Sequence, residues 1–351
     1  MLSRSFHPVI LCGGAGSRLW PASTPEKPKA FLALTGSNSL LQETALRVAA
    51  ASGAARPIVV ASWAHADLVR QQLADVGAPC DLITEPEGRG SAPAIAIAAL
   101  EIVAREPDGL ALVVACDHHV PDTHAFNAGV DAALAAAADG AIVTFGVKPA
   151  RASGAYGHIL PGPPVVGDVR AVARFIEKPN ARDAQALVDA GWLWNSGNFV
   201  FSATAMLSEL GALAPDVLAA SRAARDAAVR ASDTLALGEA FLAAPNVAID
   251  VAVMEKTARA AVLPVDYAWS DLGAWDAVLD AASRDSAGNA IQGRASVADS
   301  QECLIRAGTD TRVVAIGLKN VAIIVENGRV LVCDLARAQQ VRSATQAIED
   351  N

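Results

Sequence analysis

The sequence has few cysteines and no long apolar run. Its five cysteines are odd in number, widely scattered and free of any Cys-x-x-Cys spacing, so neither a disulfide framework nor a structural zinc site is expected. The longest apolar candidate for a membrane helix begins at residue 92 and stops at Glu101, short of the ~20 residues that a bilayer span requires. The apolar stretch at residues 8–12 is too short for a signal-peptide core. We therefore expect a cytoplasmic protein without a membrane segment.

Positive charge is also scarce. The chain has 28 Lys and Arg residues against 37 Asp and Glu residues, which gives a formal net charge of −9. Proteins that coat nucleic acids or bind anionic membranes generally need a dense basic face, so neither class of partner is expected. Any chemistry on phosphate groups must therefore depend on a few cations at defined positions.

The composition is instead that of a protein with a large core, since 52% of the 351 residues are hydrophobic and 19% are charged. From residue 8 to about residue 147, short β-branched runs alternate with longer alanine-rich stretches. This alternation predicts right-handed crossovers and a mostly parallel sheet covered by helices on both faces. Ligands bind such sheets at the carboxyl ends of the strands.

The rest of the chain has a different rhythm. A Gly/Pro-rich stretch at 161–164 breaks the alternation, and helical character returns over residues 203–244. Beyond residue 288, polar or glycine turns separate short apolar runs at 303–305, 313–316, 321–325 and 330–333. We therefore predict a main domain over 1–287 and a small C-terminal β domain over 288–351, of a coiled, β-helix-like kind, although no sequence repeat supports the coil.

The most informative segment is a glycine-rich loop after the first expected strand, Gly13-Gly-Ala-Gly-Ser-Arg18, which is followed by Lys29. Three glycines let the backbone approach a phosphate and point its N–H groups at it. A Walker loop is excluded because Arg, rather than Lys followed by Ser or Thr, ends the run. A dinucleotide fingerprint is excluded because its third glycine would fall at Leu19. Two interpretations of this segment remain: a phosphate-binding loop with two cations, and a plain turn with two solvated cations.

This loop resembles the signature of the sugar-nucleotidyltransferases. Further segments follow in that family's order over nearly the whole chain, and together they resemble the mannose-1-phosphate guanylyltransferases: Glu85-Pro-Glu-Gly-Arg89, Asp117-His118, Phe175-Ile-Glu-Lys-Pro179, Trp194-Asn-Ser-Gly197, Ile249-Asp250 and Trp269-Ser-Asp-Leu-Gly273. Gly90 stands where the family has Asn, and Asn198 where it has Met. The resemblance implies the nucleotide-diphospho-sugar transferase fold, a Rossmann-like, mixed and mainly parallel sheet. The length leaves no room for the isomerase domain of the bifunctional members, so isomerase activity is not expected.

The resemblance also implies a reaction, the transfer of GMP from GTP to α-D-mannose 1-phosphate, which gives GDP-mannose and pyrophosphate. The nucleophile is already an anion near neutral pH, so no Ser-His-Asp or Cys-His arrangement is required, and catalysis consists of positioning and charge neutralisation. Two alternatives stay open: a guanylyltransferase for another hexose 1-phosphate, and a catalytically silent sugar-nucleotide-binding regulator. The implied partners are the two small substrates and, as an expectation from the family, a second copy of the chain.

Each site residue then has an implied role. The expected catalytic cations are Arg18, Lys29 and Lys178. The expected nucleotide-binding residues are Leu11, Gly13, Gly14, Ala15, Gly16, Ser17, Arg18, Lys29, Glu85, Arg89, Ala92 and Asp117. The expected sugar-binding residues are Gly157, Glu177, Lys178, Asn195 and Asp250. Glu85 is a candidate for base selection, because a carboxylate can accept hydrogen bonds from guanine N1–H and the exocyclic amine.

The expected cofactor is Mg²⁺, which prefers oxygen ligands from one or two carboxylates plus phosphates. Asp117 follows the expected strand at 112–116, and the resemblance implies Asp271 as the second ligand. For Asp117 alone, a helix N-cap or a turn would be an equal alternative. A minor alternative is a zinc site in the cluster Asp117-His-His-Val-Pro-Asp122 with His124. Adjacent residues of an extended segment point to opposite sides, so His118 and His119 are not expected to bind one ion together. We expect His118 to support the nucleotide-binding loop instead.

Overall fold

The computed structural model describes residues 4–14 and 16–349. Contacts divide the chain into two compact units, each built from segments distant in sequence. The larger unit comprises residues 1–13, 44–116 and 120–269, and the smaller unit comprises residues 14–43, 117–119 and 270–351. The predicted division into contiguous domains, 1–287 and 288–351, remains a prediction.

The larger unit contains an 11-stranded mixed sheet. Its parallel run has the order β4-β1-β2-β3-β10, with bounds β1 (His7–Cys12), β2 (Ile58–Ser62), β3 (Asp81–Glu85), β4 (Leu110–Ala115) and β10 (Thr234–Ala236). The other strands are β5 (Ile142–Val147), β6 (His158–Val166), β7 (Val169–Ile176), β8 (Leu193–Ser202), β9 (Val229–Ala231) and β11 (Ala260–Val265). Among these, β8 is antiparallel to β4, β5 and β6, and β11 is parallel to β5. The predicted α/β fold with a Rossmann-like parallel run is confirmed.

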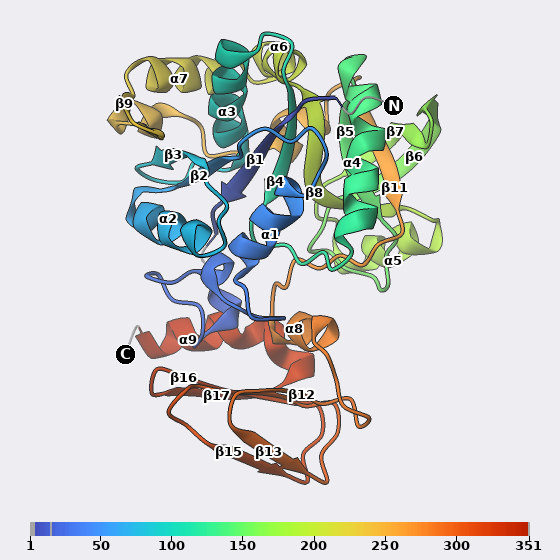
Figure 1. Cartoon of the computed structure of the whole chain (residues 1–351). Coiled ribbons are helices and arrows are strands. Elements are labelled where there is room, and N and C mark those ends of the chain that lie inside the picture. The colour runs from blue at the N-terminus through green and yellow to red at the C-terminus, as the bar shows by residue number, and fades with distance from the viewer. Residues whose placement is uncertain (1–3, 15, 350–351) are drawn as a thin grey trace. The chain divides into compact units, whose positions relative to one another are not determined.

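Several helices pack apolar side chains against this sheet. The bounds are α1 (Leu40–Ala49), α2 (Ala66–Asp75), α3 (Ser91–Arg105), α4 (Thr123–Ala138), α5 (Ala181–Asp189), α6 (Ala203–Leu213) and α7 (Pro215–Asp226). The alanine-rich α3 is buried over most of its length and packs against α6 and α7 (Figure 1). At the start of α4 the Asp122 carboxylate accepts a hydrogen bond from the Ala125 N–H at 2.8 Å, as an N-cap does.

The prediction of helix over 203–244 is wrong at its C-terminal part, where β9 and β10 form a hairpin. Alanine-rich composition favours helix locally, but β3 offers an unpaired edge and β10 pairs with it in parallel. The Leu82 N–H donates to the Asp233 carbonyl oxygen at 2.8 Å, and Ser232 turns the chain with a φ of 52°. Tertiary pairing thus overrides local helix propensity here.

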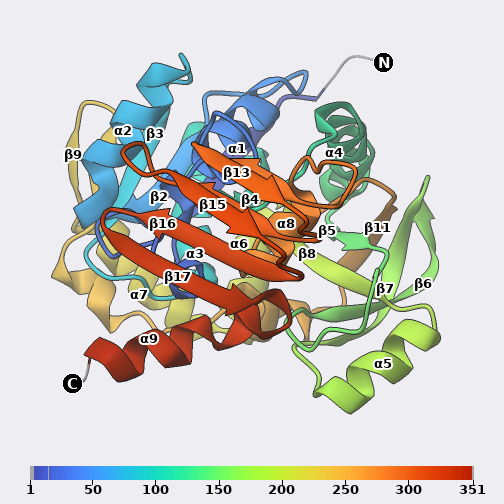
Figure 2. The same cartoon turned by 90° about the horizontal axis from the view of Figure 1, so that it is seen from below.

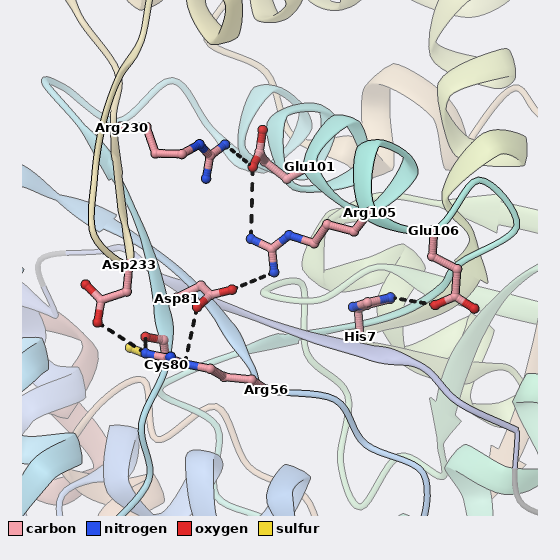
Figure 3. Close-up of polar contacts among 9 residues, drawn as sticks. All are labelled: His7, Arg56, Cys80, Asp81, Glu101, Arg105, Glu106, Arg230 and Asp233. Carbon is pink, nitrogen blue, oxygen red and sulfur yellow. Dashed lines mark hydrogen bonds and ion pairs between the residues drawn. The ribbon is translucent and has the colours of Figure 1, made fainter.

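Ion pairs fix this hairpin and the start of β3 (Figure 3). Arg56 bridges Asp81 at 3.2 Å and Asp233 at 3.1 Å, and Arg105 of α3 contacts Asp81 at 2.5 Å. The buried Glu101 accepts hydrogen bonds from Arg230 and, outside that view, from Arg225. Since Asp81 opens β3 and Glu85 ends it, this network lies at the opposite end of the strand from the candidate site.

The smaller unit combines the glycine-rich segment with the C-terminal strands. Its elements are η1 (Ser17–Leu19), η2 (Lys29–Phe31), α8 (Trp275–Ala281), β12 (Ala290–Gln292), β13 (Ala295–Ala298), β14 (Leu304–Ala307), β15 (Val313–Ile316), β16 (Val321–Glu326), β17 (Arg329–Asp334), η6 (Leu335–Gln340) and α9 (Val341–Glu349). Strands β12, β14 and β16 pair in parallel in one sheet, and β13 and β15 do so in a second. Successive strands therefore alternate between two sheets, as in a β-helix, and β17 then turns back beside β16 (Figure 2).

One hydrophobic core connects all parts of the smaller unit. Leu19 and Leu40 pack in the same cluster as Trp275 of α8 and Leu304 and Ile324 of the C-terminal strands. The Trp275 indole Nε1 donates to the Trp20 carbonyl oxygen at 3.0 Å. The C-terminal strands are therefore packed with the segment that carries the glycine loop.

All five cysteines are free thiols, four of them buried. Among the described residues, no helix is both long enough and apolar enough to cross a bilayer.

Candidate functional site

The glycine-rich loop follows β1, and its backbone conformation requires glycine. Gly14 has a φ of 98° and Gly16 a φ of 61°, a region that other L-residues rarely adopt. A Cβ on Gly16 would collide with the Cβ of Lys29 and lie 3.2 Å from the Ser23 hydroxyl oxygen. The loop is therefore packed closely against Lys29.

Of the other predicted loop residues, Leu11 lies within β1, whereas Ala15 lies outside the described residues. Ser17 and Arg18 belong to η1, and Arg18 is exposed to solvent. The predicted phosphate-binding loop thus combines a glycine-dependent backbone with an exposed cation beside it, features that suit anion binding.

Lys29 connects both predicted metal-binding aspartates. Only 5% of its surface is exposed, and its Nζ lies 2.7 Å from Asp117 Oδ2. The same ammonium donates a hydrogen bond to the backbone carbonyl oxygen of Asp271. Burial by itself would raise the pKa of Asp117, but the charges of Lys29 and His118 together with hydrogen bonds outweigh it, so the pKa is lowered and the carboxylate is ionised.

Asp117 and Asp271 each offer a carboxylate, the ligand type that Mg²⁺ prefers. The two residues come from distant parts of the sequence and meet at one ammonium group, Lys29. The Asp271 Oδ1 accepts a hydrogen bond from the Gly273 N–H at 3.3 Å, which orients this carboxylate. Two oxygen-donor carboxylates without nitrogen or sulfur ligands match the preference of magnesium, which keeps its other positions for water and phosphate oxygens.

The zinc alternative has no matching geometry in the part of the chain that the structure describes, where no three His, Cys, Asp or Glu side chains are grouped to hold a metal. His119 Nδ1 instead lies 3.3 Å from the Thr35 hydroxyl oxygen and 3.6 Å from Glu43 Oε2. Its backbone also pairs with Ser270 in a β-bridge. His119 therefore connects the segments that carry Asp117 and Asp271.

In the larger unit, Glu85 ends β3 with a carboxylate that is largely buried. One of its oxygens, Oε1, is buried without a hydrogen-bond partner. Burial raises the pKa of Glu85 to about 7. A buried carboxylate oxygen without a partner is costly for a protein to keep and is typical of a group that meets its partner on a ligand.

The segment after Glu85 is held by hydrogen bonds to the chain just before Asp250. The Val247 N–H donates to the Arg89 carbonyl oxygen at 3.2 Å, and the Ala92 N–H donates to the Val247 carbonyl oxygen at 3.1 Å. Gly90 has a φ of 78°, and a Cβ there would lie 2.5 Å from the Val247 carbonyl oxygen. The departure from Asn at this position therefore accompanies a close backbone contact that only glycine permits.

The predicted sugar-binding residues form one cluster. Asn195 of β8 donates from Nδ2 to Asp250 Oδ1 at 2.7 Å, and its backbone N–H donates to the Gly157 carbonyl oxygen at 2.8 Å. A Cβ on Gly157 would lie 2.6 Å from Glu177 Oε2, so Glu177 contacts this glycine directly. The Lys178 Nζ lies 2.6 Å from Glu177 Oε1, and its side chain is 62% exposed. All five predicted residues thus lie together.

The carboxyl groups of this cluster repel one another. Burial, and then the charge of Glu177, raise the pKa of Asp250 to about 6. Paired carboxylates that accept hydrogen bonds, together with an exposed ammonium, suit a ligand with several hydroxyl groups and a phosphate.

Sequence reasoning missed three residues of this cluster. Thr144 of β5 is fully buried and donates to Asn195 Oδ1 at 2.7 Å. His158 is fully buried, with Nδ1 3.1 Å from the Tyr156 carbonyl oxygen, and its pKa is lowered by burial. The ring of Tyr156 packs against Trp194 and Trp269 at centroid distances of 4.8 and 5.2 Å. A single polar residue in an apolar strand, such as Thr144, has no periodicity that could have indicated its role.

The raised pKa of Glu85 predicts a pH-dependent stability. Glutamate in an unfolded chain ionises near pH ~4.3, so between this value and about 7 the unfolded state has released a proton that the folded state retains. The free energy of unfolding therefore falls as pH rises through this range. As pH rises from about 5 to 8, we expect the free energy of unfolding of Glu85→Gln to increase by about 2 kcal/mol relative to that of the wild type, measured by urea unfolding.

The neighbouring Glu87→Gln variant is the matched control, because the Glu87 side chain is 64% exposed. We expect no comparable pH-dependent difference for Glu87→Gln. A stability difference between wild type and Glu85→Gln that stays constant with pH would contradict the prediction.

An α/β architecture with a glycine-rich loop, the aspartates Asp117 and Asp271, and the polar cluster around Asn195 is typical of enzymes that act on phosphorylated nucleotides and sugars. The sequence profile of the family described as nucleotidyl transferase matches residues 7–288, and the chain belongs to this family. It is 40% identical over 350 residues to an Escherichia coli protein named mannose-1-phosphate guanylyltransferase, which covers 98% of this chain and 74% of the relative. It is also 41% identical over 346 residues to the xanthan biosynthesis protein XanB of Xanthomonas campestris pv. campestris, over 97% of this chain and 73% of the relative.

A solved structure gives the same result. The crystal structure described as mannose-1-phosphate geranyltransferase from Thermus thermophilus superposes with a TM-score of 0.87 at 29% identity, covering 99% of each chain. The predicted fold and the suspected family are therefore both confirmed.

Proposed function

We propose that the protein transfers GMP from GTP to α-D-mannose 1-phosphate, giving GDP-mannose and pyrophosphate. The observation that carries this proposal is the cluster of Glu177, Asn195 and Asp250 in a chain 40% identical to a relative named mannose-1-phosphate guanylyltransferase. In the proposed reaction an oxygen of the sugar phosphate forms a bond to the α-phosphorus of GTP. The bond from that phosphorus to the oxygen of the leaving pyrophosphate breaks.

The cations of the chain would position the reactants and neutralise their charge. Arg18 lies beside the glycine loop, and Lys29 packs against the same loop, so both suit the triphosphate and the departing pyrophosphate. Lys178, held by Glu177, suits the phosphate of the sugar. The nucleophile is an anion without a proton to lose, so no general base is required, and fixed positive charge carries the catalysis.

Asp117 and Asp271 would hold Mg²⁺. Bound there, the ion would neutralise charge on the triphosphate oxygens. The residues themselves contribute an ionised carboxylate at Asp117 and a hydrogen-bonded, oriented carboxylate at Asp271. Lys29 keeps the two aspartates together through its bonds to both.

The direct test is pyrophosphate release measured with a matrix of four nucleoside triphosphates against mannose, glucose and fucose 1-phosphates, with and without EDTA. We expect turnover to be greatest with GTP and mannose 1-phosphate and to stop when the metal is chelated. Greater turnover with another sugar would favour the alternative hexose specificity. No turnover with any pair would favour the silent regulatory protein.

We propose that Glu85 recognises the guanine base. Its buried Oε1 lacks a partner, and an ionised carboxylate can accept from both guanine N1–H and the exocyclic amine. We expect Glu85→Gln to reduce the preference for GTP over ATP in kcat/KM by about 10- to 100-fold, the loss of one charge-assisted hydrogen bond. An unchanged preference would remove Glu85 from base selection, and Glu87→Gln again serves as the control.

We also propose that the protein is cytoplasmic, since both proposed substrates are small phosphorylated metabolites of the cell interior. We further propose that it forms a homodimer. The C-terminal strands carry exposed apolar side chains that a second copy of the chain would cover: Val314, Ile316, Val330 and Val332. Light scattering of the purified protein tests this state, and a monomer at micromolar concentration would contradict it.

A further inference from the structure

The hydroxyl group of Thr144 lies where two strands of the larger unit lose their regular pairing. Thr144 of β5 pairs with Phe199 of β8, but the next paired residues are Gly146 and Asn195. Two steps along β5 thus oppose four along β8, so residues 196–198 form a bulge, in which Gly197 has a φ of 71°. Bulges of this kind redirect side chains and are frequent beside active sites.

The Thr144 hydroxyl joins both sides of this bulge. It lies 2.7 Å from Asn195 Oδ1 and 3.0 Å from the Asn198 carbonyl oxygen, so one buried proton is shared between two acceptors. Thr144 is fully buried, and Asn195 is 7% exposed, so water does not compete for these bonds.

The hydrogen bonds also determine which way the Asn195 amide points. The Gly197 N–H can only donate, and it lies 3.2 Å from Asn195 Oδ1, so this atom must be the amide oxygen. The amide nitrogen Nδ2 then faces Asp250 Oδ1 at 2.7 Å. The order of donation therefore runs from Thr144 to Asn195 and from Asn195 to Asp250.

We propose that Thr144 is a positioning residue for the sugar-binding cluster: through the amide of Asn195 it orients the carboxylate of Asp250 for the hydroxyl groups of the sugar phosphate. Thr144 does not touch the sugar and acts only through Asn195. This inference rests on the proposed function, because it assigns Asp250 and Asn195 to the sugar.

Loss of the hydroxyl would release the amide. Asn195 Oδ1 would keep only the longer bond from Gly197, and the Asn198 carbonyl oxygen would lose its bond from Thr144. The amide could then rotate, which would withdraw the donor from Asp250 and leave that carboxylate beside Glu177 without its orienting partner. The effect should appear in sugar binding and leave the GTP site unchanged.

The test compares Thr144→Val, which keeps the shape and removes the donor, with the wild-type protein under steady-state conditions. We expect the KM for mannose 1-phosphate to rise about tenfold, equivalent to ~1.4 kcal/mol. We expect kcat and the KM for GTP to stay within about twofold of wild type. The ratio of kcat/KM for mannose 1-phosphate to that for glucose 1-phosphate should fall, because the hydroxyl contacts are less well placed.

Two further variants separate positioning from general destabilisation. Thr144→Ser restores the hydroxyl and should restore the KM for mannose 1-phosphate. Thr204→Val removes a hydroxyl that donates to the Pro107 carbonyl oxygen at 2.7 Å outside the cluster, and it should leave both KM values unchanged. If Thr144→Val does not fold, Thr144→Cys replaces it, because a thiol fills the space and donates only weakly.

The outcomes distinguish the two proposals. A wild-type protein that forms no GDP-mannose would overturn the proposed function. A wild-type protein that is active, with a Thr144→Val or Thr144→Cys variant of unchanged KM for mannose 1-phosphate, would overturn only the positioning role. An equal rise of both KM values, or no recovery in Thr144→Ser, would overturn it as well.

Discussion

The Lys178→Ala variant is expected to turn over about 10²- to 10³-fold more slowly than the wild-type protein, because removing one preorganised charge-stabilising donor has this effect in other enzymes. Lys178 is an exposed cation of the predicted sugar-binding cluster, and its Nζ lies 2.6 Å from Glu177 Oε1. The Lys178 backbone lies in the left-handed region, with a φ of 44°, and the surrounding structure holds it in this conformation. Steady-state kinetics with GTP and mannose 1-phosphate measure the loss.

The fold should survive this change. An exposed ion pair contributes about 0–1 kcal/mol, so the melting temperature of Lys178→Ala should stay close to that of the wild type. The matched control is Lys256→Ala, which removes another exposed lysine of the larger unit and should leave kcat unchanged. A Lys178→Ala variant with near-wild-type kcat would remove Lys178 from the mechanism.

The Lys29→Met variant should lose both activity and stability. Lys29 is buried and bonded to Asp117 and to the Asp271 backbone, so methionine fills its volume but leaves the Asp117 carboxylate without its counter-charge. We expect the free energy of unfolding to fall by about 2 kcal/mol, less than for a fully buried pair because the Asp117 side chain is 23% exposed. We expect kcat to fall by about 10²-fold, since a cation beside the phosphate loop is lost.

The double variant Lys29→Met/Asp117→Asn separates the two effects. Removing both charges should restore most of the stability, since no unpaired charge stays buried, whereas activity should stay low. Denaturant unfolding and pyrophosphate release measure the two properties on the same samples. If the single and double variants were equally unstable, the ion pair would not be the cause of the loss.

Much of the fold follows from hydrophobic periodicity. The alternation of β-branched runs with alanine-rich stretches over residues 8–147 predicts a sheet, and the structure forms β1 to β5 there, because β-branched residues buried on both faces favour a sheet interior. The pattern was less informative for β6, which contains Pro161, Pro163 and Pro164 and pairs with β7 through several register shifts. The prediction of helix was wrong over 229–236, because residues of β10 pair with the edge strand β3 instead.

Local sequence patterns predicted the glycine loop of the candidate site but not its long-range contacts. The glycines at 14 and 16 are local requirements, since each needs a positive φ, and the sequence pattern could identify them. The partnership of Lys29 with Asp117 and Asp271 requires three distant segments to meet. Family resemblance could suggest these residues, but no local pattern indicates that one ammonium would bind both.

The sequence alone predicts a glycine-rich loop after the first strand, and its family resemblance implies two aspartates for magnesium and a set of polar residues for a sugar. Tertiary packing decides how those groups are held: Glu85 is buried with one unpartnered oxygen, and the Thr144 hydroxyl donates to the Asn195 amide beside a bulge. Loop conformation and strand periodicity depend on neighbouring residues. Burial, pKa and amide orientation depend on groups that only folding brings together.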